Sequence, residues 1–427
     1  MHPGGMSREL VGAIDCRGSG FVGARLEERK MSNLTAPEVA VEGEITPSPV
    51  VRTKERLLSL DIFRGMTLIA MTVVNMPGDH HYTYRAISHA GWNGWTIADL
   101  IFPFFIFIVG VAMPYSFAGR QARGDSQRKL LGHILLRSAI LFAVGVFMTW
   151  YYNFMSGIPR YHLANIRIFG ALQRIALCYF FASILYLRLK NRGLAITAVL
   201  ILVLYFILLR FVPVPGHTGP VLGREGNWVQ FVDLHVMPNH LFYDHWESKG
   251  WLGTFPAVAN MLIGVLVGVF LRSARSGMEK ARSLMVAGTV GMFLGLVWSV
   301  WIPINQNLWT SSLVVFMCGM ATAILGCCYY VADVRKITWW TKPFVIVGVN
   351  SLFLWVVAGT TDSLTNLELV KVSLANGAKV PLPDVIAHFF ASYIGPVNGS
   401  ELYAFAWMAL WLGVLTVMYK KRIIVKV

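Results

Sequence analysis

A histidine, an asparagine and an aspartate are spaced so that one turn between two helices brings them together. His89 lies fourteen residues after Asn75 and ten residues before Asp99, and long apolar segments flank this stretch. A tight loop between two such helices places all three side chains at one membrane surface. An imidazole ionises near neutral pH, so it can accept a proton, return it, or carry an acyl group. The alternative is an interfacial histidine beside an aromatic belt of Trp92 and Trp95.

Further ionisable side chains lie inside apolar segments, where hydrocarbon makes a charge costly. Arg64 follows Asp61 by three residues, which puts both side chains on one helical face. Arg174 follows Gln173 near one end of the fourth apolar segment. A buried guanidinium needs a carboxylate, a carbonyl or a ligand phosphate as its partner. A structural ion pair therefore competes with a functional role, and for Asp99 the helix dipole alone is a sufficient explanation.

The elements that position these residues are membrane-spanning helices. Hydrophobic residues make up 56% of the 427 residues and charged residues 14%, and the mean hydropathy is +0.57. Since about 20 apolar residues cross the hydrocarbon core, the sequence predicts an all-α polytopic protein with about ten spans. The predicted spans are 58–77, 95–118, 130–152, 170–187, 193–213, 252–271, 282–303, 308–331, 341–360 and 400–419. A shorter apolar segment, 384–397, is the candidate for an eleventh, and we interpret it as a re-entrant or interfacial helix.

Basic residues indicate which loops face the cytoplasm. In the ten-span arrangement, 21 Lys and Arg residues flank the spans on the side of the N-terminus, and seven lie on the opposite side. The positive-inside rule then predicts that both termini are cytoplasmic and that loops 78–94 and 214–251 face outward. The net charge of +15 is explained by this bias, so we do not expect nucleic acid as a partner.

The chain is expected to have two parts. Residues 1–51 are rich in Gly, Glu, Pro and Ser, which predicts a disordered cytoplasmic tail, and Met31 offers an alternative start. Residues 52–427 form the predicted transmembrane domain. The tail has no pattern of a cleavable signal peptide. The histidines and cysteines do not have the spacing of a metal site, so no metal is expected.

Four stretches resemble a known family, the heparan-alpha-glucosaminide N-acetyltransferases and their bacterial relatives. They read RLLSLDIFRG, HAGWNGWTIADLIFPFFIFIVG, GALQRIALCY and PINQNLWTSSLVVF, and the resemblance runs from about residue 52 to the C-terminus. Animal members of this family acetylate a terminal glucosamine, using acetyl-CoA from the opposite side of the membrane. The resemblance therefore implies a membrane acetyltransferase in a bacterial inner membrane, acting on an amino sugar or glycan end, and it suggests a homodimer.

The resemblance assigns His89 and Asn75, and the chemistry of acetyl transfer suggests roles for the other residues. His89 corresponds to the active-site histidine, as general base or as carrier of the acetyl group, and both routes stay open. Asn75 would donate to the thioester oxygen, and Asp99 would orient the imidazole. The residues expected to bind acetyl-CoA are Arg64, Gln173 and Arg174. The residues expected to bind the sugar are Trp92, Asn93, Glu247, Asn305, Asn307 and Trp309.

One difference from the animal members bears on the acceptor. Only a tail of about fifty residues precedes the first span, where those members carry a substantial luminal domain. We therefore do not expect heparan sulfate itself to be the acceptor. Some bacterial relatives are described as sugar-related transporters, so an amino-sugar transporter without acyl transfer is the alternative function.

The predicted topology can be tested by labelling. Cysteines introduced at Ser88 and Ser248 are expected to react with an impermeant thiol reagent added outside intact cells, because both loops should face outward. Labelling of both sites only after lysis would contradict the topology and any reaction that depends on it.

Overall fold

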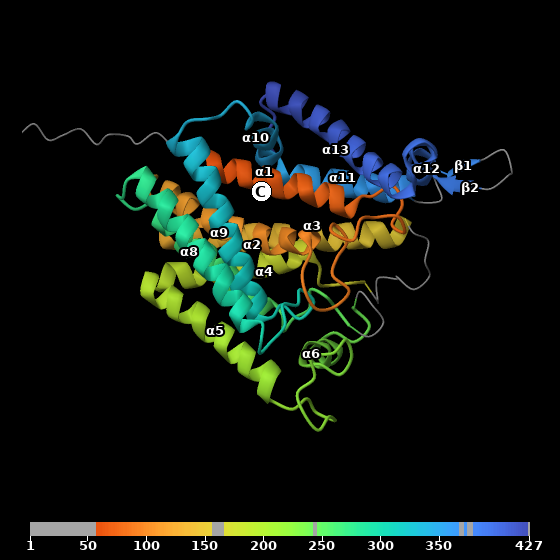
Figure 1. Ribbon diagram of the computed structural model, residues 1–427. Helices are drawn as coiled ribbons and strands as arrows, with labels where there is room; N and C mark the ends of the chain where they lie inside the picture. Colours follow the sequence, from red (N-terminus) through yellow and green to blue (C-terminus); the bar gives the residue numbers. More distant parts are fainter. Residues whose placement is uncertain (1–56, 156–165, 242–245, 367–370, 374–378, 426–427) are drawn as a thin grey trace, which may run out of the picture. The chain divides into compact units, whose positions relative to one another are not determined.

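Helices make up almost all of the regular structure (Figure 1). The computed structural model describes residues 57–155, 166–241, 246–366, 371–373 and 379–425, all of which belong to the unit Lys54–Val427. The tail predicted for residues 1–51 lies outside the described residues. The all-α fold expected from the sequence is confirmed.

Nine helices in the described part of the chain are long and apolar enough to cross a membrane, and the number is ten when one bent pair is counted as a single span. The nine are α1 (Leu58–Asn75), α2 (Ile97–Gln121), α3 (Gln127–Met155), α4 (Ala171–Arg188), α5 (Asn191–Phe211), α7 (Thr254–Leu271), α8 (Gly277–Trp298), α9 (Ser311–Cys328), which a π-helix (Tyr329–Val334) continues, and α13 (Pro396–Lys420). These helices agree with the order of the predicted spans, and with their number when the bent pair is counted as one span. A short helix, α6 (Trp228–Val236), lies in the loop predicted to face outward.

The span predicted at 341–360 is not one continuous helix, as the sequence had suggested, but a bent pair of helices. Helices α10 (Lys342–Val349) and α11 (Ser351–Asn366) meet at Asn350 with a bend of 79°. The Asn350 amide is fully buried; it donates to the carbonyl of Ile423 over 3.1 Å and accepts the N–H of Val425 over 3.0 Å. The break therefore fixes the chain that follows α13 against the middle of the span.

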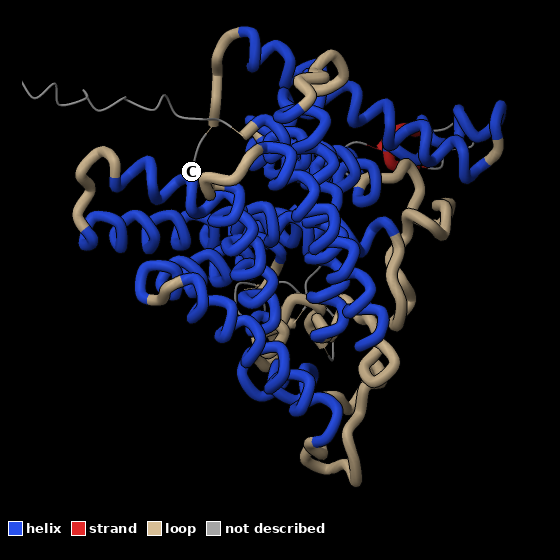
Figure 2. The backbone as a smooth tube through the Cα atoms, turned by 60° about the vertical axis from the view of Figure 1, so that its left-hand side comes forward, coloured by secondary structure: helices blue, strands red, loops and turns tan. Residues whose placement is uncertain are grey.

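The short segment at 384–397 does not cross the membrane as a full span. Helix α12 (Leu382–Ile394) has 13 residues, which is about 20 Å at 1.5 Å per residue, against about 30 Å of hydrocarbon. It ends at Gly395, whose φ of 86° a residue with a side chain rarely adopts. A ribbon of two antiparallel strands, β1 (Lys371–Ser373) and β2 (Lys379–Pro381), lies beside it (Figures 1 and 2).

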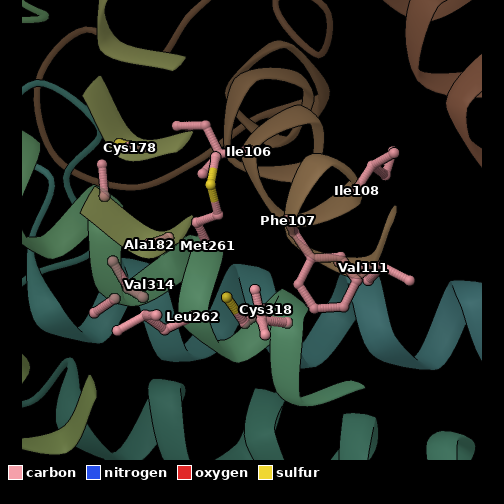
Figure 3. Packing of buried hydrophobic residues seen from close by; sticks show 14 of the residues in the cluster. Ile106, Phe107, Ile108, Val111, Cys178, Ala182, Met261, Leu262, Val314 and Cys318 are labelled. Atoms are coloured by element: carbon pink, nitrogen blue, oxygen red, sulfur yellow. The ribbon is translucent and has the colours of Figure 1, made fainter. Parts of the chain in front are cut away.

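The helices pack around two apolar cores. The larger core comes mainly from α2, α4, α7 and α9, and Figure 3 shows part of it, where Ile106 and Phe107 meet Met261, Leu262 and Cys318. The smaller core comes from α1, α10, α11 and α13. Phe105 on α2 packs against both cores, so the two groups of helices meet along this helix.

Helices α2 and α7 touch backbone to backbone through glycines. A Cβ on Gly264 would lie 2.3 Å from the carbonyl oxygen of Phe107, and one on Gly268 would lie 2.4 Å from that of Val111. A Cβ on Gly110 would lie 2.2 Å from the carbonyl oxygen of Met261. Gly264 and Gly268 are four residues apart, the spacing at which small residues let membrane helices approach closely.

Proline makes the start of α2 depend on other elements. Pro103 lies inside α2 and has no N–H, so the carbonyl of Asp99, four residues earlier, lacks its helical partner. The side chain of Gln306 donates to this carbonyl over 3.4 Å. The carbonyl of Pro103 accepts from the amide of Asn260 on α7 over 3.2 Å. These contacts tie α2 to α7 and to the segment before α9.

The glycine contact predicts a large effect of a small substitution. Gly264→Val is expected to lower the unfolding free energy by about 1–3 kcal/mol or more, because the side chain meets the α2 backbone, which cannot move aside cheaply. Gly413→Val on α13 is the control, since no atom lies within 4 Å of its added Cβ. Melting curves in detergent would compare the two, and equal melting temperatures would contradict the packing.

Candidate active site

A buried carboxylate organises the first turn of α2 and the loop before it. The Asp99 side chain is 2% exposed, and its Oδ2 accepts the backbone N–H groups of Ala90 and Thr96, each over 3.0 Å. Asp99 is the third residue of α2 and Thr96 its N-cap, so the carboxylate satisfies a donor that the helix leaves unpaired. The Thr96 hydroxyl donates to the carbonyl of Ser88 over 2.7 Å. Residues 88–90 are thereby held against the helix start.

The same carboxylate binds the histidine. His89 Nδ1 lies 2.7 Å from Asp99 Oδ1, and the His89 side chain is 54% exposed. An ionised carboxylate only accepts, so Nδ1 carries a proton and donates it. In the neutral ring Nε2 is then the basic nitrogen. The predicted juxtaposition of His89 and Asp99 is therefore present, with Nε2 as the atom available to take a proton or an acyl group.

His89 borders a cavity of about 540 Å³ that follows α2. Its wall includes Ala98 near the start of α2 and Ser116 near its end, which are about 27 Å apart at 1.5 Å of rise per residue. That length is close to the thickness of the hydrocarbon core, about 30 Å. The other walls come from α1, α3, α4, α10 and α11, so the cavity lies where the two groups of helices meet.

The end of the cavity away from His89 is lined by a positively charged residue and by part of the segment that follows α13. Arg64 lines the wall there and bonds Asp61 and the carbonyl of Gly348, each over 3.5 Å. Val425, which Asn350 holds, lines the same cavity. Arg137, part of the wall along α3, lies 4.6 Å from the ring centre of Tyr179. Arg137 lies within a predicted span, but it was not among the predicted site residues, because a structural ion pair was the better explanation for an arginine there.

Four of the predicted site residues share this cavity. Asn75, His89, Arg64 and Gln173 all line it. The amide of Asn75 donates one N–H to the carbonyl of Met71 over 2.8 Å, which leaves its second N–H for another acceptor. The first-helix asparagine and the loop histidine thus meet at one mouth, as their spacing predicted.

Arg174 lies elsewhere, although it adjoins Gln173 in sequence. Successive helical residues point about 100° apart, and Arg174 is fully buried away from the cavity wall. Its guanidinium donates to the carbonyl of Gly250 over 3.0 Å and stacks 4.9 Å from the ring centre of Trp309. The contacts of Arg174 are therefore those of a structural arginine that holds the loop before α7.

The six residues predicted to bind sugar are absent from the described cavity wall. Trp92 donates its ring N–H to the carbonyl of Leu222 over 2.9 Å, and Asn305 donates to the side chain of Asn93 over 3.1 Å. Asn305, Trp309 and Glu247 are fully buried, and Asn307 is half-buried. Within NQN it is the middle residue, Gln306, that lines the cavity and donates to Asp99. Sequence alone offered no way to distinguish these three amides.

Lys249 is another residue that was not among the predicted site residues, and it lines the same cavity as His89. Arg167 forms a bidentate ion pair with the buried Glu247, with Nε 2.8 Å from Oε2. Glu247 Oε1 also accepts the N–H of Lys249 over 2.9 Å. The available signal was the scarcity of basic residues in the outward loops, which makes each lysine there unusual.

The family comparison covers the residues that build this mouth. A profile of the family described as heparan-alpha-glucosaminide N-acetyltransferase, catalytic, matches residues 56–300, more than half of the chain. This chain belongs to that family. The matched segment contains His89, Asp99 and Lys249 and ends before Gln306.

Two similar proteins carry the family's name. The heparan-alpha-glucosaminide N-acetyltransferase of Mus musculus is 28% identical over 386 residues, which are 76% of this chain and 57% of that protein. That of Homo sapiens is 28% identical over 379 residues, 74% of this chain and 55% of the human protein. The chain thus spans little more than half the length of these relatives.

The double use of Asp99 predicts a structural effect of its removal. Asp99→Ala is expected to lower the unfolding free energy by about 1–3 kcal/mol, because three donors lose a buried, charged acceptor. Asp125→Ala is the control, since Asp125 pairs with the exposed side chain of Lys129, and such a pair contributes little. Melting curves in detergent should separate the variants, and an unchanged melting temperature for Asp99→Ala would contradict this role.

Proposed function

We propose that this chain transfers the acetyl group of cytosolic acetyl-CoA to the amino group of a sugar on the opposite side of the membrane. The observation that carries the proposal is the His89–Asp99 pair at one mouth of a cavity that follows α2 for about 27 Å. Membership of the acetyltransferase family supports the choice of reaction. The acceptor we propose is a glucosamine-type sugar, free or at the end of a glycan.

The proton chemistry falls to His89. The sugar nitrogen attacks the thioester carbonyl, the C–N bond forms, and His89 Nε2 takes the proton that the nitrogen loses. The C–S bond then breaks and CoA leaves as its thiolate. Asp99 keeps the Nδ1 proton in place and stabilises the imidazolium once it forms. In the two-step route, Nε2 itself attacks the carbonyl, and the amine attacks the acetyl-imidazole.

The oxygen of the thioester gains negative charge during either route. Asn75 lines the cavity and retains one amide N–H beyond its bond to Met71, so it can donate to this oxygen. Gln306 lines the same mouth, and its amide is already directed to the carbonyl of Asp99. We assign the oxygen contact to Asn75.

The cavity suits an elongated acyl donor. Ile101, Phe105 and Val109 lie four residues apart along α2 and give the middle of the cavity an apolar wall, which fits an extended pantetheine arm. Arg64 at the other end supplies a guanidinium for phosphate oxygens. Gln173 provides an amide between these ends. The site for the donor would thus run from the cytoplasmic end of α1 to His89.

The location follows from the charge distribution. With 21 basic residues flanking the spans on one side and seven on the other, we propose that both termini lie in the cytoplasm of a bacterium and that the chain resides in its inner membrane. His89 then faces outward. The homodimer suggested by the resemblance stays a prediction.

The decisive variants alter His89. His89→Ala is expected to lower acetyl transfer from labelled acetyl-CoA to glucosamine by about 100- to 10,000-fold, which is the contribution of a general base. His89→Asn keeps an N–H for Asp99 but has no basic nitrogen, so it should fail equally. Melting temperatures should change little, because about half of the His89 side chain is exposed.

Neighbouring histidines provide the controls. His80→Ala and His81→Ala should keep more than about a tenth of the activity, since both side chains are exposed and neither lines the cavity. Full turnover by folded His89→Ala protein would refute the mechanism. If wild-type protein shows no transfer and no thermal stabilisation by acetyl-CoA, while proteoliposomes take up sugar, the transporter is the correct function.

A further inference from the structure

Lys249 has no part in the reaction described so far, although its side chain lines the same cavity as His89. Its Nζ lies 5.9 Å from the ring centre of Phe102 and donates to Ser248 Oγ over 3.1 Å. Phe102 also lines the cavity and follows Asp99 by one turn of α2. The ammonium is therefore on the cavity wall beside the first turn of α2, where His89 is bound.

The backbone of this loop is fixed on both sides of Lys249. On one side, Glu247 accepts the N–H of Lys249 and is itself bound by Arg167. On the other side, Asp233 on α6 accepts the N–H of Trp251 over 2.8 Å, and Arg174 donates to the carbonyl of Gly250. These bonds fix the backbone of Lys249, and Ser248 Oγ accepts from its Nζ, so the ammonium has a defined position on the wall, as a preorganised electrostatic contact requires.

The surroundings of Lys249 disfavour a permanent charge. Burial lowers the pKa of the Lys249 ammonium to about 8; Arg167 and, more weakly, Arg174 contribute, while Glu247 and Asp99 oppose them. Arg167 engages Glu247 through two hydrogen bonds, and Glu247 binds the backbone N–H of Lys249, while the Lys249 ammonium donates to Ser248 Oγ. The ammonium is thus charged at neutral pH and can still release a proton.

We infer that Lys249 is a second catalytic residue, whose ammonium stabilises the departing thiolate of CoA and donates a proton to it. This inference rests on the proposed acetyl transfer. When the tetrahedral intermediate collapses, the electron pair of the C–S bond goes to sulfur. The Lys249 N–H proton then moves to that sulfur and gives the thiol. The neutral amine regains a proton from water, while His89 releases to the outside the proton it took from the sugar nitrogen.

The chemistry matches the leaving group. A free alkyl thiol has a pKa of about 8.5, close to that of this lysine, and proton transfer between such groups is most effective when the two values are similar. In a Ser-His-Asp triad the imidazolium itself returns its proton to the leaving group, so His89 is the competing proton donor. We place Lys249 in this role because its ammonium lies on the cavity wall beside the first turns of α2.

A leaving-group experiment tests the inference. Lys249→Met is expected to lower turnover of acetyl-CoA by about 100-fold or more, the usual contribution of a general acid. The same protein should lose less than about tenfold with an aryl thioester as donor, because an aryl thiolate leaves without protonation. Loss of folded protein would lower both rates equally, so the ratio of the two donors isolates the role of Lys249. An equal loss with both donors would overturn the inference.

The pH profile gives a second, independent measurement. In wild-type protein the ammonium is lost as pH rises through about 8, so acetyl-CoA turnover should fall on that limb. The Lys249→Arg side chain stays charged, so the ratio of its turnover to that of wild type should rise as the pH increases through about 8. The sugar amine titrates equally in both proteins, so its effect cancels in this ratio. Arg85→Met, which removes an exposed outer-loop charge, should keep the wild-type profile. A flat ratio for Lys249→Arg would contradict the role of Lys249.

The outcome also separates this inference from the proposed function. If wild-type protein transfers acetyl groups and Lys249→Met loses the same factor with acetyl-CoA and with the aryl thioester, only the role of Lys249 is refuted. Absence of acetyl transfer by wild-type protein from either donor refutes the proposed function, and the inference with it.

Discussion

The site depends on one buried carboxylate that has two tasks. Asp99 Oδ2 satisfies the N–H groups of Ala90 and Thr96, and Asp99 Oδ1 binds the imidazole of His89. Because the Asp99 side chain is 2% exposed, water does not readily replace a lost partner of this carboxylate, so each bond is costly to break. The position of His89 and the first turn of α2 are therefore set together. A histidine on a loop thereby acquires the fixed tautomer that acid–base chemistry needs.

Helix α2 carries this arrangement through the membrane because its two faces do different things. One face packs backbone to backbone on α7, where Gly110, Gly264 and Gly268 leave no room for a side chain. The other face presents Phe105 and Val109 to the cavity. Close packing on one side keeps the helix in place, and side chains from α3 and α11 form other parts of the cavity wall.

Charges near the mouth are arranged so that few of them reach the cavity unpaired. Glu247 is fully buried and forms an ion pair with Arg167. Arg174 donates to the carbonyl of Gly250 and stacks on the ring of Trp309. Lys249 differs, because its backbone N–H binds the buried carboxylate while its ammonium stays on the cavity wall. The buried pairs thus position a loop, and we propose that the lysine within it acts on the ligand. This division explains why a count of charged residues in the loop is a poor guide to function.

The sequence by itself determined the ten spans, their order and the meeting of Asn75, His89 and Asp99, because hydrophobic length and short loops are local properties. The side chain of Asn350, where the helix breaks, is hydrogen-bonded to the segment after α13, more than seventy residues later. No local sequence pattern could therefore predict the break. Likewise, Gln173 faces the cavity and Arg174 does not, and Gln306 lines it where Asn305 is buried. Which face of a helix or turn meets a cavity is set by packing between distant segments. Only the tertiary structure decided it.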